Sequence, residues 1–208
     1  MKIIFVFVSS MTPLVSLSAA YSSPFRDHSY FLTDFTGTRK INTLAMISTH
    51  NSATLKTFIL AAQIQQLNIT EQLKAGVRVF DFRVRSFENV FAIHHDLVYL
   101  RMIFVDIVNQ VIESLREYPF EFVIMLMQKK YVSEASTMTE CEFLKNKYIK
   151  PLGNLFVQFW SVDGIVEKHR GKILLARGNK GFGECVVALD CEQKNQWKIS
   201  PSFTRDDK

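Results

Sequence analysis

The sequence predicts an α/β fold in which helices alternate with buried strands. Phe122 to Met127 is a continuous apolar run, typical of a strand covered on both faces of a parallel sheet. An amphipathic helix precedes it, with apolar residues every three to four positions from Ile103 to Leu115, and Pro119 ends this helix. A helix followed by a buried strand is a crossover unit. Polar groups follow several of the expected strands, as in a (β/α) barrel.

The other expected elements are assigned by period and by turn residues. Gly76 suits the end of a helix, and residues 21–40 mix Ser, Asp, Thr, Gly and Pro without a period. In chain order we expect an irregular lead-in over 21–40, a strand over 44–48, a helix over 58–74, strands over 77–84 and 90–95, a helix over 140–148, and strands over 172–176 and 185–189.

The length limits how complete the barrel can be. The 208 residues are 48% hydrophobic and 22% charged, as in one globular domain. No low-complexity linker divides them, so we expect one domain over 41–208. A closed eight-stranded barrel typically needs ~200 to 250 residues. We therefore expect a TIM-barrel-like fold that is incomplete or truncated at its C-terminus.

The first 20 residues are interpreted as a secretory signal peptide. Lys2 precedes an apolar stretch that continues to Leu17, and Ser18-Ala19-Ala20 follows. The alternative is an N-terminal strand or a short anchor. A secreted, extracellular protein is expected, with a net charge that falls from +5 to +4 when Lys2 is removed. A positive charge favours approach to an anionic membrane. Nucleic acid binding is not indicated, because no basic run carries interleaved aromatic residues.

Three cysteines and one sequon bear on modification. In an oxidising compartment Cys185 and Cys191 are the natural pair, with Cys141 left over; three buried free thiols are the alternative. None of the three forms a zinc-binding pattern. Asn68-Ile69-Thr70 is a glycosylation sequon if the chain is secreted and the site is exposed.

Strand alternation predicts which polar side chains share a pocket. Along 77–85, Asp81 and Arg83 emerge on one face, opposite a face of apolar side chains. At the end of 91–95, only one of the adjacent His94 and His95 can point at the pocket, and we choose His95. His50 follows the first strand. Two histidines and a guanidinium suit acid–base chemistry on a phosphate.

These residues carry a resemblance to a known family. The segments Ser48-Thr49-His50-Asn51-Ser52, 72–83, His94-His95 and 118–121 resemble, in order and spacing, the X region of phosphatidylinositol-specific phospholipase C, in its bacterial, metal-independent form. The likeness runs from about Leu44 to Arg177. It implies a barrel enzyme in which the inositol 2-hydroxyl attacks its own phosphorus, releasing diacylglycerol and a cyclic inositol phosphate from phospholipid at a membrane surface.

The resemblance also implies roles for individual residues. His50 would act as base and His95 as acid; Arg83 would stabilise the phosphoryl oxygens, with Asp81 beside it orienting the donors. The family's substrate lysine falls near Gln128 and Lys129, and its arginine near Arg177. Asp190 is the candidate for an inositol-contacting aspartate, and no segment matches the family's later aspartate that holds the base.

Two departures from the family bear on the mechanism. Asn51 stands where the bacterial enzymes carry an aspartate; calcium-dependent relatives carry His-Asn, so a divalent ion bound through Asn51 is an alternative to the expected absence of a metal. Asp96 stands where a glycine usually follows the second histidine, and its charge should raise the pKa of His95. The leading hypothesis is a secreted phosphodiesterase of the phospholipase C type. The alternatives are a catalytically impaired headgroup-binding protein and a metal-dependent phosphodiesterase acting on another phospholipid.

Overall fold

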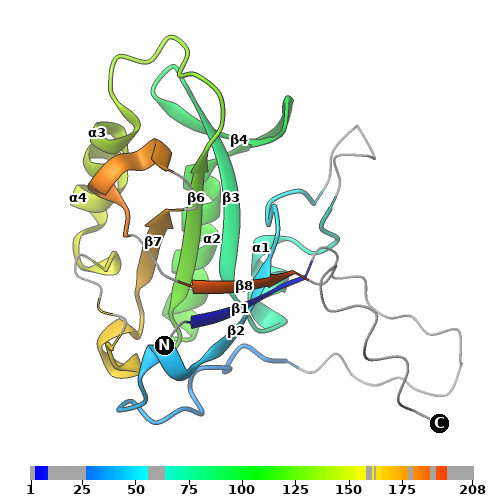
Figure 1. Cartoon of the computed structure of the whole chain (residues 1–208), viewed down its shortest axis with the longest axis vertical. Helices are drawn as coiled ribbons and strands as arrows, with labels where there is room; N and C mark the ends of the chain where they lie inside the picture. The colour runs from blue at the N-terminus through cyan, green and yellow to red at the C-terminus, as the bar shows by residue number, and fades with distance from the viewer. Residues whose placement is uncertain are drawn as a thin grey trace, which may run out of the picture.

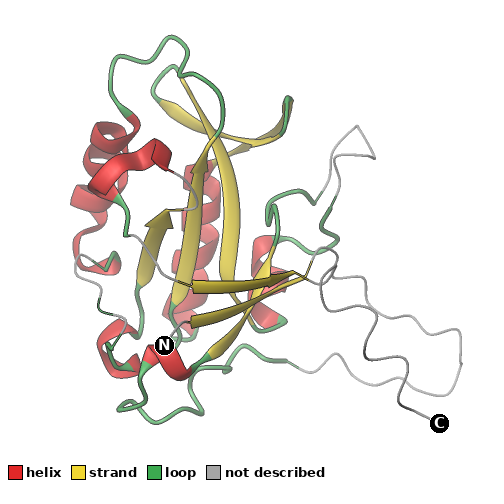
Figure 2. Ribbon diagram, in the orientation of Figure 1, coloured by secondary structure: helices red, strands yellow, loops and turns green. Residues whose placement is uncertain are grey.

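The computed structural model is organised around one curved sheet (Figures 1 and 2). It describes residues 27–55, 64–157, 161, 163–177 and 180–187, together with the backbone of two further strands at 3–8 and 191–195. The strands are β1 (Ile3–Val8), β2 (Ala45–Thr49), β3 (Val77–Phe87), β4 (Val90–His95), β5 (Val98–Ile103), β6 (Val123–Lys129), β7 (Ile173–Arg177) and β8 (Cys191–Asn195).

The helices are fewer and follow the strands β2, β5 and β6. They are α1 (Ile69–Lys74), α2 (Phe104–Glu117), α3 (Glu140–Leu144) and α4 (Lys150–Leu152), with a π-helical turn at Lys145–Ile149 between the last two. Short 3-10 turns lie at Ile41–Thr43, Gly153–Leu155, Val166–His169 and Lys180–Cys185. Among the described residues, no helix combines the length and the apolar composition that crossing a bilayer requires.

Six parallel strands form a partial barrel. Their order is β8-β1-β2-β3-β6-β7, and every neighbouring pair in that series is parallel. No pairing between β7 and β8 closes the series within the described residues. The expected incomplete (β/α) barrel is confirmed.

The long strand β3 also carries an antiparallel extension. Beyond Arg83 its second half pairs with β4, which pairs in turn with β5. Because β4 runs antiparallel to β3, its far end at His95 returns toward the level of Arg83. Val84 lies opposite Ile93, only two residues before His95.

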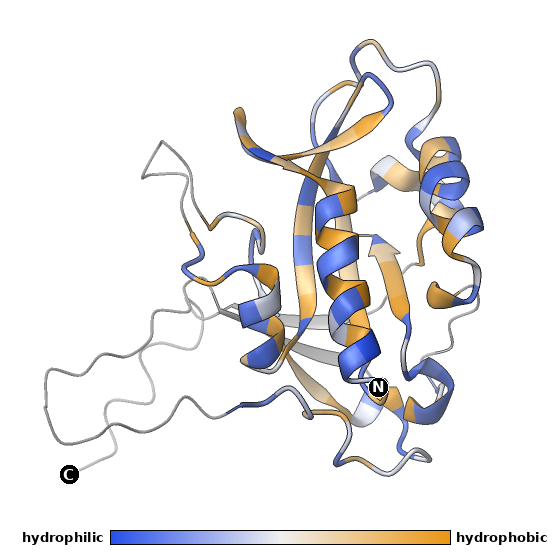
Figure 3. Cartoon of the chain, turned by 180° about the vertical axis from the view of Figure 1, so that it is seen from behind, coloured by the Kyte–Doolittle hydropathy of each residue, from blue (hydrophilic) through white to orange (hydrophobic). Residues whose placement is uncertain are grey.

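The sheet separates two apolar cores. On the outer face, Phe80, Phe82 and Val84 of β3 pack with the apolar stripe of α2, as predicted from alternation. Seen from behind, α2 crosses this face with its polar residues outward (Figure 3). On the inner face, Val79 packs with residues of β2, β6 and β7 and with Leu32 of the lead-in. Each fully buried aliphatic side chain contributes about 1.5–3 kcal/mol.

A buried ion pair anchors the lead-in beneath the barrel. Arg78 of β3 donates to Glu121 at 2.7 Å, and both side chains are almost completely buried. The carboxylate of Glu121 also accepts hydrogen bonds from the backbone of Leu32 and Thr33 at 2.8–2.9 Å. The desolvated charges are therefore fully partnered, which is the condition under which a buried pair is tolerated.

Two expected elements have wrong bounds, and one strand was not expected. The helix expected over 58–74 begins only at Ile69, because Asn68 caps it through a capping box with Glu71; residues 56–63 lie outside the described part. Strand β5 was not predicted, and it precedes α2 directly. The last expected strand, 185–189, is instead a single bridge at Val187, with Cys185 at the end of a 3-10 turn and residues 188–190 outside the described part.

The segment interpreted as a signal peptide contains strand β1 in the full sequence. Ile3–Val8 pairs with β2 on one side and β8 on the other. An N-terminal strand was the alternative to a signal peptide. Removal of residues 1–20 remains a prediction, and a mature chain lacking them would lack this strand. The described part of the lead-in, 27–40, consists of turns, bends and a bridge at Lys40.

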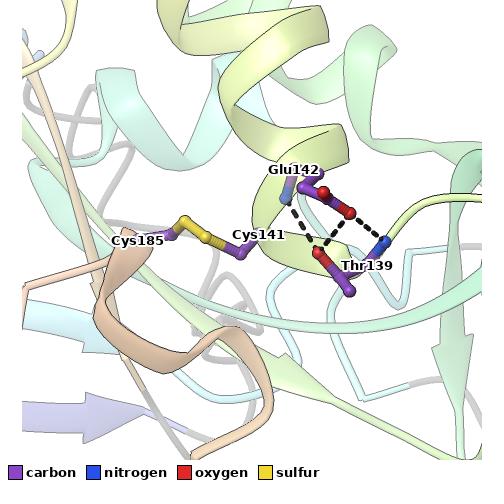
Figure 4. The surroundings of a disulfide bond; sticks show 4 residues. All are labelled: Thr139, Cys141, Glu142 and Cys185. Atoms are coloured by element: carbon purple, nitrogen blue, oxygen red, sulfur yellow. Dashed lines mark hydrogen bonds between the residues drawn. A yellow bond between two sulfur atoms is a disulfide. The ribbon is translucent and has the colours of Figure 1, made fainter.

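The cysteine pairing expected from spacing is wrong. Cys141 and Cys185 form the disulfide, and their Cα atoms lie 5.4 Å apart (Figure 4). Helix α3 packs against the 3-10 turn at Lys180–Cys185, which brings together residues 44 positions apart. Thr139 begins α3 with a capping box to Glu142, so the turn that carries Cys141 is held at its start.

Candidate functional site

The first site residue is His50, which directly follows strand β2. Thr49 pairs with Phe80 in the parallel register, so the next residue on each strand, His50 and Asp81, come to the same level. The carbonyl of His50 accepts a hydrogen bond from the Gln65 side chain at 2.7 Å. The imidazole is 40% exposed, whereas the Asp81 side chain is 2% exposed, so the pair runs from the interior to the surface.

Asp81 is the centre of this site. Its Oδ2 accepts from Nδ1 of His50 at 2.9 Å and from the backbone N–H of Asn51 at 3.3 Å. Its Oδ1 accepts from the Gln128 amide at 2.8 Å. A carboxylate that is almost fully buried needs such donors to offset its lost hydration. The aspartate therefore orients His50, whereas we had expected it to orient the donors beside Arg83.

Arg83 completes a line of three side chains. Its Nη2 lies 3.0 Å from Nε2 of His50. A guanidinium can only donate, so Nε2 must be the accepting nitrogen and Nδ1 must carry the hydrogen that faces Asp81. The contacts on both sides thus select one tautomer of the neutral ring. That tautomer presents a lone pair at Nε2, which is the requirement for a base.

Asn51 shapes the turn that leaves β2. Its backbone has φ 47°, in the left-handed region that asparagine tolerates better than most residues. The side chain is buried, and neither its Nδ2 nor its Oδ1 has a hydrogen-bond partner. Buried amides without partners are rare and call for an explanation.

Of the two candidates after the buried strand, Gln128 joins the group and Lys129 does not. Gln128 pairs in register with Arg83 and reaches Asp81. Lys129 is in register with Val84 and forms a 2.7 Å ion pair with Glu140. Gln128 was named from the sequence only because it lies near the position of the family's lysine, since an uncharged amide gives no sequence signal of a functional site. The register that places it beside Arg83 comes from the pairing of β3 with β6, which the sequence does not show.

His95 lies close enough to the group to respond to its charges. Burial lowers the pKa of His95 below its ordinary value, and the charges of Arg83 and His50 act in the same direction. Asp96 raises this pKa, as expected, but the lowering influences prevail. The His95 ring makes no hydrogen bond to the described part of the chain. It is Asp96 that reaches Arg83, with 3.6 Å between Oδ1 and Nη1.

The remaining candidate residues, Arg177 and Asp190, do not join the group around Asp81 in the described part of the chain. Arg177 ends β7 with an exposed side chain, one strand beyond Gln128. Asp190 lies outside the described residues. The His94 ring packs on Tyr99, with centroids 5.6 Å apart, and the charge that acts on this ring is that of Arg85. The described residues contain no cluster of three His, Cys, Asp or Glu side chains suited to a metal ion.

Comparison with known proteins identifies the family of this chain. The family model described as phosphatidylinositol-specific phospholipase C, X domain, matches residues 39–177, more than half of the chain. The chain belongs to this family. The matched range contains the elements that carry His50, Asp81, Arg83, His95 and Gln128.

Two curated relatives are 1-phosphatidylinositol phosphodiesterases from two strains of Staphylococcus aureus. Each is 32% identical over 118 residues, which are 55% of this chain but only 38% and 36% of those proteins. A solved structure of the S. aureus phospholipase, from work on its membrane binding, has a TM-score of 0.67 at 24% identity and covers 73% of this chain and 53% of its own. The Listeria monocytogenes enzyme has a TM-score of 0.60 at 20% identity, covering 74% and 57%. The chain thus covers a little over a third of the length of the two curated relatives and about half of the two solved structures.

Proposed function

We propose that this chain is a phosphodiesterase of the phospholipase C type that cleaves phosphatidylinositol into diacylglycerol and a cyclic inositol phosphate. The line from Asp81 through His50 to Arg83 carries the proposal, because it couples a buried carboxylate, a ring of selected tautomer and a cation. The family match and the curated relatives support the same substrate class.

In the first step His50 acts as the base. A substrate phosphate replaces the imidazole as the acceptor for Arg83, since a guanidinium binds two phosphoryl oxygens in a planar, bidentate fashion. This frees Nε2 to take the proton of the inositol 2-hydroxyl as its oxygen attacks phosphorus. The positive charge that develops on the ring is stabilised by Asp81 at 2.9 Å.

In the same displacement His95 acts as the acid. The bond from phosphorus to the glycerol oxygen breaks, and the protonated ring of His95 gives its proton to that oxygen. A lowered pKa makes His95 a stronger acid but reduces its protonated fraction at neutral pH. The negative charge of a bound phosphate opposes that reduction, so substrate binding itself favours the protonated ring.

The decisive experiment measures cyclic inositol phosphate by phosphorus NMR after incubation with phosphatidylinositol vesicles. We expect product from the wild type and a loss to background in His50→Ala. The matched control is His28→Ala, on the lead-in, which should leave the rate unchanged. Equal background from the wild type and His50→Ala would contradict the proposal, and saturable headgroup binding under those conditions would support the impaired, binding-only alternative.

The calcium-assisted alternative rests on Asn51. Its buried, unpartnered amide would offer an oxygen to a cation. The neighbouring Asp81 is already engaged by three donors, and Arg83 brings a positive charge beside it, which disfavours a divalent ion there. We therefore expect the activity to be insensitive to chelator. A requirement for added calcium, lost in Asn51→Ala, would favour the metal-dependent reaction.

The proposed substrate places the protein at a membrane surface, outside the cell if the signal peptide is cleaved. Expression with a secretory host and N-terminal sequencing of the released protein test this. A mature chain beginning near Tyr21 is expected. A retained Met1 would support the strand interpretation of the N-terminus instead.

A further inference from the structure

A groove of about 430 Å³ lies on the β3–β4–β5 extension, outside the group around Asp81. Its walls are Arg85, Phe87, Glu88, Val90, Ala92, His94, Tyr99 and Ile103. This volume lies within the range of small-molecule pockets, which are typically ~300–1,000 Å³.

The groove is one face of the three antiparallel strands. Ala92 lies opposite Arg85 on β3 and Ile103 on β5, and His94 lies opposite Tyr99. Directly opposed residues share a face of a sheet. The other face of the extension, with Phe91 and Ile93, is closed by the outer core. The groove face is therefore the face of the extension that the core leaves open.

The groove also continues the surface that carries the phosphate site. Arg83 and Arg85 are two residues apart on β3, so they point to the same side and lie roughly 7 Å apart along the strand. Asp96 connects the end of the extension to Arg83. A ligand whose phosphate lies at Arg83 would extend into the groove through its next few atoms.

Two buried polar atoms in the groove have no partner. His94 is 7% exposed, and its Nδ1 makes no hydrogen bond; Nε of Arg85 is also buried and unpartnered. The terminal nitrogen Nη2 of Arg85 is already held in an ion pair with Glu134. Burial lowers the pKa of His94, and the nearby charge of Arg85 lowers it further, so the ring is neutral at neutral pH.

These observations describe a ligand that is largely apolar and carries an uncharged acceptor. A neutral imidazole among Ala92, Val90 and Tyr99 suits a carbonyl oxygen, which accepts from a ring N–H, followed by methylene groups. A carboxylate is less suited, because the only fixed cation in the groove is neutralised by Glu134. Ester-linked acyl chains have this composition, and in a glycerophospholipid they begin a few bonds from the phosphate.

We infer that this groove binds the acylated glycerol part of the lipid substrate, with His94 donating to an ester carbonyl and the apolar walls covering the first acyl carbons. The inference rests on the proposed function for the position of the phosphate. It assigns His94 a binding role, whereas from the sequence we chose His95 for the pocket and gave His94 no role.

Direct binding is measured with 1,2-dihexanoylglycerol as the probe, by NMR titration of the full chain without any turnover. We expect saturable binding with shifts confined to β4 and β5. Val90→Asp should weaken binding at least about tenfold, because the ligand would desolvate a carboxylate. Val105→Asp is the matched control, since Val90 and Val105 are 36% and 37% exposed and only Val90 lines the groove.

A second variant tests the ester contact. His94→Phe keeps an aromatic ring against Tyr99 but removes the nitrogen, and we expect roughly threefold to tenfold weaker binding of dihexanoylglycerol. Equal affinity of wild type, His94→Phe and Val90→Asp would overturn the inference, as would the absence of saturable binding. Tighter binding of hexanoate than of dihexanoylglycerol would identify a fatty-acid site instead and would also overturn it.

Activity separates this inference from the proposed function. If the wild type cleaves both dihexanoyl phosphatidylinositol and deacylated glycerophosphoinositol, Val90→Asp should lower kcat/KM about tenfold for the first and leave the second unchanged. Equal losses on both substrates would contradict the groove. If neither substrate is cleaved but dihexanoylglycerol binds as described, the proposed function fails and the groove stands.

Discussion

Replacing Asp81 with asparagine should remove the orientation of His50 while keeping the shape of the site. Gln128 donates to Oδ1 of Asp81, so the substituted amide would keep its oxygen on that side. Its NH₂ group would then face Nδ1 of His50, where the carboxylate now accepts at 2.9 Å. Two donors would oppose each other, and the ring would change to the tautomer with hydrogen on Nε2.

The tautomer with hydrogen on Nε2 is unfavourable beside Arg83 and cannot act as a base. Nε2–H would face the guanidinium of Arg83, which lies 3.0 Å away and can only donate. It would also lack the lone pair that accepts the hydroxyl proton. In triad enzymes the corresponding loss is about 10⁴-fold in kcat, equivalent to about 5 kcal/mol of activation free energy. We expect a fall of about 10³- to 10⁴-fold for Asp81→Asn.

The assay is the initial rate of cyclic inositol phosphate formation on phosphatidylinositol vesicles, with thermal unfolding measured on the same preparation. Asp163→Asn is the control, because that side chain is 65% exposed and its contacts are with Lys40 and Asn42, outside the group around Asp81. It should retain the wild-type rate. A folded Asp81→Asn protein whose rate lies within about tenfold of the wild type would refute the orienting role.

Three further predictions concern the acid, the disulfide and the buried ion pair. The charge of Asp96 raises the pKa of His95, so Asp96→Asn should lower that pKa further. Because the acid acts only below its pKa, the fall of kcat/KM with rising pH should then begin at a lower pH. A pH profile that is unchanged or shifted upward would argue against His95 as the acid. Cys141→Ser should lower the free energy of unfolding by about 3–4 kcal/mol, because the disulfide joins residues 44 positions apart, whereas Cys191→Ser should leave it unchanged. Denaturant unfolding of both variants decides between the pairing of Cys185 with Cys141 and its pairing with Cys191. Glu121→Leu should lower the free energy of unfolding by about 3–5 kcal/mol, because it leaves the guanidinium of Arg78 buried and unpaired. A decrease below about 1 kcal/mol, measured by denaturant titration, would show that water reaches Arg78.

The pattern of apolar and polar residues within each segment was sufficient to predict the central strands of the sheet. Apolar runs marked the strands around Ile47, Phe82, Ile93, Met125 and Leu175, since a strand buried in a sheet shows in its own composition. Alternation also separated the outer face of β3 from the face with Asp81 and Arg83. Strand β5 was missed because Val98, Leu100 and Met102 continue without a break into the apolar stripe of α2.

What could not be predicted depends on contacts between distant segments. The role of Asp81 follows from the register of Thr49 with Phe80, and the inclusion of Gln128 follows from its register with Arg83. Neither register can be predicted from the residues of one strand alone. The pairing of Cys141 with Cys185 likewise depends on how α3 packs against the turn after β7, whereas spacing alone favoured the shorter loop to Cys191.

The protonation of the His50 ring is the property on which the catalytic account depends most directly. Nitrogen-15 NMR of imidazole-labelled protein above the titration range of histidine reports which ring nitrogen carries the hydrogen. We predict hydrogen on Nδ1 and a free lone pair on Nε2 in the wild type, with the opposite tautomer in Asp81→Asn. A wild-type ring with hydrogen on Nε2 would contradict the account, because such a ring could neither accept from Arg83 nor serve as the base.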